Sequence, residues 1–89
     1  MEYFKIKKYY IIRQLGEGKF SKIYLSTNLK NFFALKIIDY DNGKKEIEYI
    51  DNIDNTSNNN CIYYIEYFKF EKYMIIIYPL MFLSLDKLL

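Results

Sequence analysis

The sequence Leu-Gly-Glu-Gly-Lys-Phe-Ser-Lys-Ile-Tyr-Leu, residues 15–25, places two glycines two positions apart between segments that favour β-strands. A residue without a Cβ atom can adopt a positive φ and allows a ligand to approach the backbone closely, so that amide N–H groups face an anion. The flanking segments, Tyr9–Leu15 and Lys22–Asn28, are rich in the β-branched and aromatic residues of strands. We therefore predict a β-hairpin whose turn, Gly16–Ser21, suits a phosphate group.

A lysine lies inside the next apolar segment. Phe32–Ile38 reads Phe-Phe-Ala-Leu-Lys-Ile-Ile and predicts a third antiparallel strand, in which Lys36 stands between Leu35 and Ile37. Burying an unpaired charge is costly, so a lysine in such a strand needs an anionic partner or a route to water.

Two other glycine-rich phosphate loops do not fit these residues. A Walker-type loop needs a glycine five positions before Gly18 and a serine or threonine after Lys19, but those positions hold Arg13 and Phe20. A dinucleotide-binding loop leads from a strand into a helix and has a third glycine, whereas here Ser21 occupies that place and the following residues continue as a strand.

The combined pattern resembles the nucleotide-binding lobe of a eukaryotic serine/threonine protein kinase. That family has a Gly-x-Gly-x-x-Gly-x-Val loop and then a lysine in a Val-Ala-Ile-Lys context. Residues 16–23 read Gly-Glu-Gly-Lys-Phe-Ser-Lys-Ile and residues 33–36 read Phe-Ala-Leu-Lys. Ser21 departs from the third glycine, and a similar small-residue substitution occurs in SR-protein kinases. The stretch from Gly18 to Ser21 leans towards the group that contains the SR-protein and cyclin-dependent kinases.

Composition limits the other classes of function. Eighty-nine residues with 52% hydrophobic content allow one globular domain, and a net charge of +2 is too small to argue for nucleic acid or an anionic membrane. Cys61 is the only cysteine, which excludes an internal disulfide and a cysteine-based metal site. The start has no apolar signal core, and the longest apolar run, Met74–Leu83, is too short to span a bilayer. We expect a cytoplasmic or nuclear location.

The rest of the chain completes an α+β fold. Residues 1–8 have no clear period and are predicted to be a lead-in, with a partial kinase domain over residues 9–89. A break at Asp39–Gly43 precedes a helix at Lys44–Ile53, and the polar segment Asp54–Asn60 is predicted to be an exposed loop. The turns are predicted at Asn28–Asn31, where asparagine tolerates the left-handed region, and at Glu71-Lys72. The five predicted antiparallel strands are Tyr9–Leu15, Lys22–Asn28, Phe32–Ile38, Cys61–Phe70 and Tyr73–Tyr78.

The predicted helix carries two candidates for the partner of Lys36. The resemblance implies that this helix corresponds to αC of a kinase, whose glutamate pairs with the strand lysine and precedes an inward apolar residue by four positions. Glu46 with Ile50 fits that pattern, whereas Glu48 is followed four positions later by Asn52. Glu46 is therefore the predicted partner, although its distance of ten positions from Lys36 is shorter than is usual in the family.

The end of the chain resembles the kinase hinge and the start of αD. Ser84 can cap a helix that continues to Leu89. On this match Tyr78 takes the gatekeeper place, with Ile77 as the other candidate, and backbone groups of Pro79 and Met81 face the adenine edge.

The same resemblance implies an ATP site. Leu15, Ile23 and Ala34 would form an apolar roof over adenine, the amides from Gly16 to Ser21 would cover the phosphates, and Lys36 would hold the α- and β-phosphates. The nucleotide-binding residues implied in this way are Leu15, Gly16, Glu17, Gly18, Lys19, Phe20, Ser21, Ile23, Ala34, Lys36, Pro79 and Met81.

The sequence matches only the first third of a kinase. It contains no histidine and no Asp-Phe-Gly, so it has neither the catalytic loop nor the metal-binding motif. We expect ATP as the ligand, Mg²⁺ only together with a second lobe, and no catalytic residue in this chain. The expectation is a truncated lobe that is inactive alone. The alternatives are a stand-alone lobe that acts as a regulator or decoy and binds a protein through its underside, and an unrelated small β-rich protein.

Overall fold

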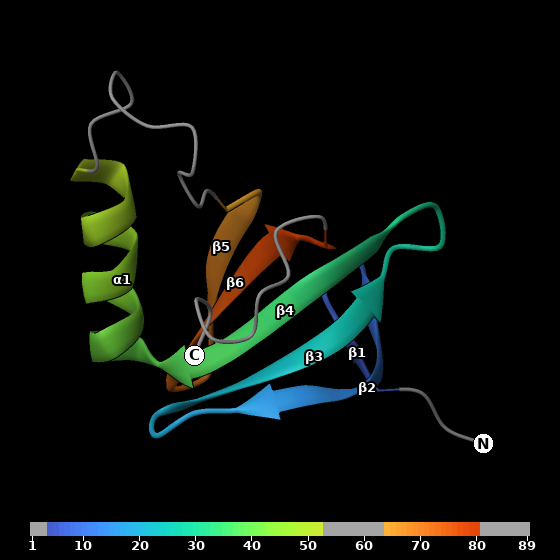
Figure 1. Cartoon of the computed structure of the whole chain (residues 1–89), viewed down its shortest axis with the longest axis horizontal. Coiled ribbons are helices and arrows are strands. Elements are labelled where there is room, and N and C mark those ends of the chain that lie inside the picture. Colours follow the sequence, from blue (N-terminus) through green and yellow to red (C-terminus); the bar gives the residue numbers. More distant parts are fainter. Residues whose placement is uncertain (1–3, 53–63, 81–89) are drawn as a thin grey trace.

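A six-stranded antiparallel sheet with one helix forms the part of the chain that the computed structural model describes, residues 4–52 and 64–80 (Figure 1). The order of the strands across the sheet is β1-β2-β3-β4-β6-β5. The elements are β1 (Lys5–Ile6), β2 (Tyr9–Glu17), β3 (Ser21–Thr27), β4 (Phe32–Asp39), α1 (Tyr40–Asn52), β5 (Glu66–Phe70) and β6 (Tyr73–Pro79).

The prediction of five strands is wrong by one strand. The sixth strand is β1, which lies within the predicted lead-in and pairs Ile6 with Tyr9 of β2. Two residues are too few to show a period of two in the sequence. The strand forms because Ile6 is buried on the sheet, where 1% of its surface is exposed.

The first hairpin forms as predicted, but its turn is shorter. β2 continues through Gly16 to Glu17, which pairs with Lys22, so the turn consists of residues 18–20 alone. Neither glycine uses its access to positive φ; the non-glycine residues Lys7, Leu29 and Glu71 have positive φ instead. In the turn between β3 and β4 it is therefore Leu29, rather than an asparagine, that adopts the left-handed region.

The helix begins four residues earlier than predicted, and the predicted break at Asp39–Gly43 is wrong. Asp39 ends β4 and caps the helix, because its Oδ2 atom accepts the Asn42 N–H at 3.1 Å. Gly43 therefore lies inside α1, which follows β4 without a connecting loop. The predicted last helical residue, Ile53, lies outside the described residues.

The second hairpin is also shorter than predicted. β5 begins at Glu66, so Tyr64 and Ile65 are not part of a strand, and the turn at Glu71-Lys72 is confirmed. Residues 61–63, the predicted loop Asp54–Asn60, Met81 and the predicted start of αD lie outside the described residues.

Buried side chains form one cluster on each face of the sheet. We call the face that α1 covers the helix face and the opposite one the far face. The helix face contains Ile23, Ala34, Ile38, Ile47, Met74, Ile76 and Tyr78. The far face contains Ile6, Tyr9, Leu35, Ile75 and Ile77. The alternation of neighbouring residues between the two lists is that of strands buried on both sides. Within residues 4–52 and 64–80, α1 is the only helix, and it is too short and too polar to cross a membrane.

Candidate functional site

The strand β4 places Lys36 and Ala34 on the helix face. Lys36 pairs with Ile23 of β3 and with Ile76 of β6, and Ala34 pairs with Tyr78 of β6. Residues two apart on a strand share a face, so the sequence Ala-Leu-Lys presents the small side chain and the ammonium group on the same side. Lys36 lies near the middle of the sheet, and only 4% of its surface is exposed.

Glu46 of α1 lies directly against this lysine. The Lys36 Nζ atom donates a hydrogen bond to Glu46 Oε1 at 2.7 Å, and the exposed fractions of the two side chains are 6% and 23%. The structure thus brings together the two residues that the sequence analysis paired, in spite of the ten-residue spacing. The spacing suffices because α1 starts immediately after β4, so that Glu46 lies in the second turn of the helix.

Tyr78 contacts the second oxygen of the same carboxylate. Its hydroxyl group donates a hydrogen bond to Glu46 Oε2. Burial, followed by the neighbouring Glu46 carboxylate, raises the pKa of Tyr78 well above its ordinary value. Ile77, the other candidate for the gatekeeper place, is buried in the cluster on the far face. Tyr78 is therefore the residue at the end of β6 that faces Lys36.

Gly43 sets how closely the helix approaches the sheet. A Cβ atom at this position would come within 2.4 Å of Met74 Cβ and 2.9 Å of Ile38 Cγ2. Gly43 and Ile47 are the buried residues of α1, and they lie four positions apart on its sheet-facing side. This role of Gly43 was not predicted from the sequence. An isolated glycine within a helical pattern was the signal that could have shown it.

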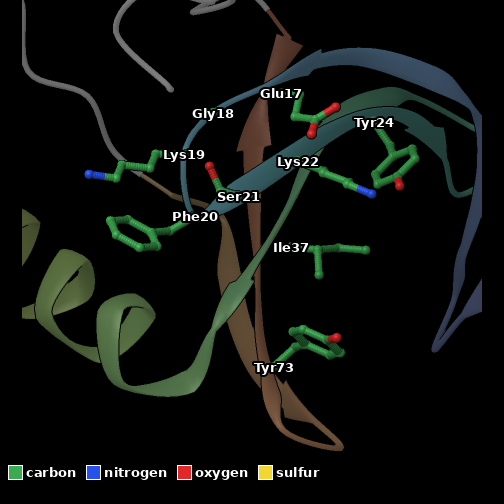
Figure 2. A pocket seen from close by; sticks show the side chains of 9 residues that line it. All are labelled: Glu17, Gly18, Lys19, Phe20, Ser21, Lys22, Tyr24, Ile37 and Tyr73. Atoms are coloured by element: carbon green, nitrogen blue, oxygen red, sulfur yellow. The ribbon is translucent and has the colours of Figure 1, made fainter.

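The glycine turn closes on itself in this structure. The Gly18 N–H donates a hydrogen bond to the Ser21 carbonyl oxygen at 2.8 Å, so this amide is engaged within the hairpin. The side chains of Lys19 and Phe20 extend to the side of the sheet on which α1 lies (Figure 2). Phe20 is 60% exposed, as a side chain at the open rim of a site would be.

A cavity of about 390 Å³ lies beside the glycine turn, but it is not the site around Lys36. Its walls include Lys22, Tyr24, Ile37 and Tyr73, whose side chains point away from α1 in Figure 2. Ile37 and Lys36 are neighbours on β4 and so face opposite sides of the sheet. This cavity therefore belongs to the far face.

The remaining predicted residues fall into three groups. Leu15 and Ile23 pack with Ala34 in the cluster of the helix face. Glu17 and Lys22 pair across the hairpin, next to the turn. Pro79 ends β6, where it pairs with Phe33, and Met81 lies outside the described residues. Within the described ranges, no group of three or more cysteine, histidine, aspartate or glutamate residues could hold a metal ion.

Comparison with solved structures identifies the type of fold that carries this site. No family model matches the chain, and no curated protein matches it. Among solved structures, the crystal structure of the kinase domain of PF14_0431 is similar with a TM-score of 0.67 and 24% sequence identity. The fold is kinase-like. The match covers 85% of this chain and 27% of that kinase domain, so the kinase-like chain spans about a quarter of the neighbour's length. The kinase-like α+β lobe predicted from the sequence is thus confirmed as a fold, with six strands in place of five.

Proposed function

We propose that this chain is the ATP-binding lobe of a serine/threonine protein kinase. The observation that carries the proposal is the buried ion pair of Lys36 with Glu46, on the same face of the sheet as Ala34. A buried ammonium group held by a carboxylate is presented in a fixed place, where it can bind the phosphates of a nucleotide. The kinase-like fold supports the same reading.

The two ends of ATP would contact different residues of the helix face. Leu15 packs against Ile23 and Ala34 in the apolar cluster of the helix face, where Ile23 and Ala34 have none of their surface exposed. A flat adenine ring that lay against the small side chain of Ala34 would therefore have to displace the groups that cover it. Lys36 would hold the α- and β-phosphates. Because the Gly18 amide is engaged by Ser21, the turn amides of Lys19 and Phe20 are the ones we expect to face the phosphates first.

We propose further that these 89 residues do not transfer a phosphoryl group by themselves. Phosphoryl transfer requires metal-borne charge and a residue that orients the nucleophile, and the kinase motifs for both are absent from the sequence. Mg²⁺ would be held together with a second lobe. A site closed on one side only should bind ATP weakly, with Kd on the order of 1 mM, because a complete pocket buries most of its ligand. Assignment to the SR-protein or cyclin-dependent kinase group rests on the stretch from Gly18 to Ser21.

Nucleotide titration of two lysine variants tests the site. Lys36→Met should abolish the chemical-shift changes that Mg-ATP causes in the NMR spectrum of the wild-type chain. The matched control is Lys22→Met, which makes the same substitution on β3 at an exposed position and should bind as the wild type does. Equal binding by all three proteins would show that Lys36 does not bind the nucleotide and that the proposal is wrong.

The size of the native polypeptide distinguishes the two ways in which such a lobe could work. A product well above 10.9 kDa would place these residues in a longer kinase that carries the catalytic loop downstream. A product of 10.9 kDa would favour the alternative of a stand-alone regulatory or decoy lobe. An immunoblot of the source with an antibody to residues 1–8, or the intact mass of the native protein, makes the measurement.

A further inference from the structure

We propose that Tyr78 is a positioning residue, whose hydroxyl group holds the Glu46 carboxylate in the orientation that presents it to Lys36. This inference rests on the proposed ATP-binding function, because it concerns how the nucleotide-binding lysine is set in place. It assigns to the residue at the gatekeeper place a polar role, carried out through Glu46 and not through contact with the nucleotide.

The Glu46 carboxylate accepts hydrogen bonds from two donors, one on each oxygen. Glu46 receives the ammonium group of Lys36 on Oε1 and the hydroxyl group of Tyr78 on Oε2. A carboxylate fixed at one oxygen can still rotate about its last torsion, which is broad for glutamate. A second donor on the other oxygen fixes the plane of the group, so the direction of the Glu46 oxygen towards Lys36 is set by both contacts.

The side chain of Tyr78 is held more rigidly than that of Glu46. Its side chain belongs to β6, which is paired with a strand on each side, has 1% of its surface exposed and packs in the same cluster as Ala34 and Ile47. Glu46 is less buried than Tyr78, because 23% of its side chain is exposed. A tyrosine has two side-chain torsions and glutamate has three, so the buried ring is the fixed reference and the glutamate is the part that it orders.

The donor from Tyr78 is a neutral hydroxyl group. A tyrosine hydroxyl group orients the carboxylate without neutralising it, so the negative charge of Glu46 remains available to Lys36. Burial and the carboxylate both favour the protonated hydroxyl group and raise the pKa of Tyr78, so the donor keeps its proton throughout the physiological range. Phenylalanine at this position would fill the same space and lack only the donor.

A double-mutant cycle on ATP affinity tests the inference. Tyr78→Phe should weaken the binding of Mg-ATP about threefold to tenfold, because the loss of one hydrogen bond to a charged group frees Glu46 to turn away from Lys36. In a Glu46→Ala background the same change should have no effect, since there is no carboxylate left to orient. Tyr73→Phe, which removes a hydroxyl group on the far face, is the control and should bind as the wild type does. A role in packing alone would not produce this dependence on Glu46.

The outcomes separate this inference from the proposed function. If Lys36→Met binds Mg-ATP as the wild type does, the nucleotide site itself is wrong. If Lys36→Met loses binding while Tyr78→Phe keeps it, or while Tyr78→Phe and Glu46→Ala are additive, the role of Tyr78 alone is overturned. One measurement needs no variant: the Tyr78 hydroxyl proton of the wild-type chain should give a slowly exchanging NMR signal. Fast exchange with water would overturn the inference even if Tyr78→Phe failed to fold.

Discussion

Gly43 of α1 lies so close to Met74 of β6 that a side chain as small as a methyl group would come within 2.4 Å of the Met74 Cβ atom. The Met74 Cβ atom is attached to the strand backbone and cannot move aside by a change of rotamer. The helix approaches the sheet to this extent only because residue 43 is glycine. Glu46 follows one turn later on the same helix, so the same contact sets the distance from its carboxylate to Lys36.

Gly43→Ala should therefore destabilise the chain, although alanine is the better helix former. Overpacking of this kind costs about 1–3 kcal/mol, and the helix preference of alanine returns about 1 kcal/mol, so we expect a net loss of about 0–2 kcal/mol. Urea unfolding measures the change. Lys44→Ala, at the next and exposed position, is the control and should change the stability by less than about 0.5 kcal/mol. A Gly43→Ala variant more stable than the wild type would show that the helix can retreat without cost.

The parts of the fold that sequence reasoning predicted are those with a local signal. Phe32–Ile38 is apolar throughout and contains one lysine, which is enough to predict both a buried strand and the need of Lys36 for an anionic partner. The helix start could not be predicted correctly, because aspartate and glycine are both residue types that are common in turns. The hydrogen bond from the Asn42 N–H to Asp39 shows that Asp39 caps the start of the helix. The contact with Met74, which is distant in sequence, shows that Gly43 lies inside the helix.

Strand β1 and the contact of Tyr78 with Glu46 could not be predicted, because both depend on residues that are distant in sequence. Ile6 joins the sheet through burial against residues far along the chain, and a two-residue strand leaves no period to detect. For Tyr78, the identity of the residue was readable, but its face and its contact with Glu46 depend on the register of β6 against β4. From the sequence alone, Ile77 therefore remains a candidate beside Tyr78.

Glu66 should stabilise the fold by joining the first hairpin to the strand β5. The buried Tyr9 hydroxyl group donates to Glu66 Oε2, and Lys7 Nζ lies 3.3 Å from Oε1. Glu66→Ala leaves that hydroxyl group without its acceptor, which should lower the free energy of unfolding by about 1–3 kcal/mol. In a Tyr9→Phe background the substitution should cost much less, and urea unfolding of the four proteins measures the coupling. Additive effects would show that the hydrogen bond does not link these strands.

Leu29→Asn should stabilise the turn between β3 and β4. Leu29 has φ of 77° and 75% of its surface is exposed, so its side chain contributes little packing while its backbone lies in the left-handed region. Asparagine tolerates that region better than leucine, and we expect a gain of about 0.5–1 kcal/mol in thermal or urea unfolding. Lys30→Asn makes a similar change at the neighbouring exposed position and should have no comparable effect. A loss of stability in Leu29→Asn would mean that the leucine side chain makes a contact worth more than the strain.

Asp39 should give the fold a specific sensitivity to acid. Hydrogen bonds from the Asn42 side chain, and then from its backbone N–H, lower the pKa of Asp39 below its ordinary value of 3.8. A carboxylate whose pKa is lower in the folded state contributes stability above the unfolded-state pKa. That contribution is lost as the pH falls through the lower, folded-state value.

Urea unfolding between pH 7 and pH 2.5 checks this expectation. The wild type should lose stability more steeply below about pH 4 than Asp39→Asn, which still offers an amide oxygen to cap the helix but does not titrate. Asn42→Ala removes the largest cause of the lowered pKa and should also flatten the acid limb, even though Asp39 remains. Parallel curves for all three proteins would show that the Asp39 carboxylate is not held by Asn42 at the start of α1.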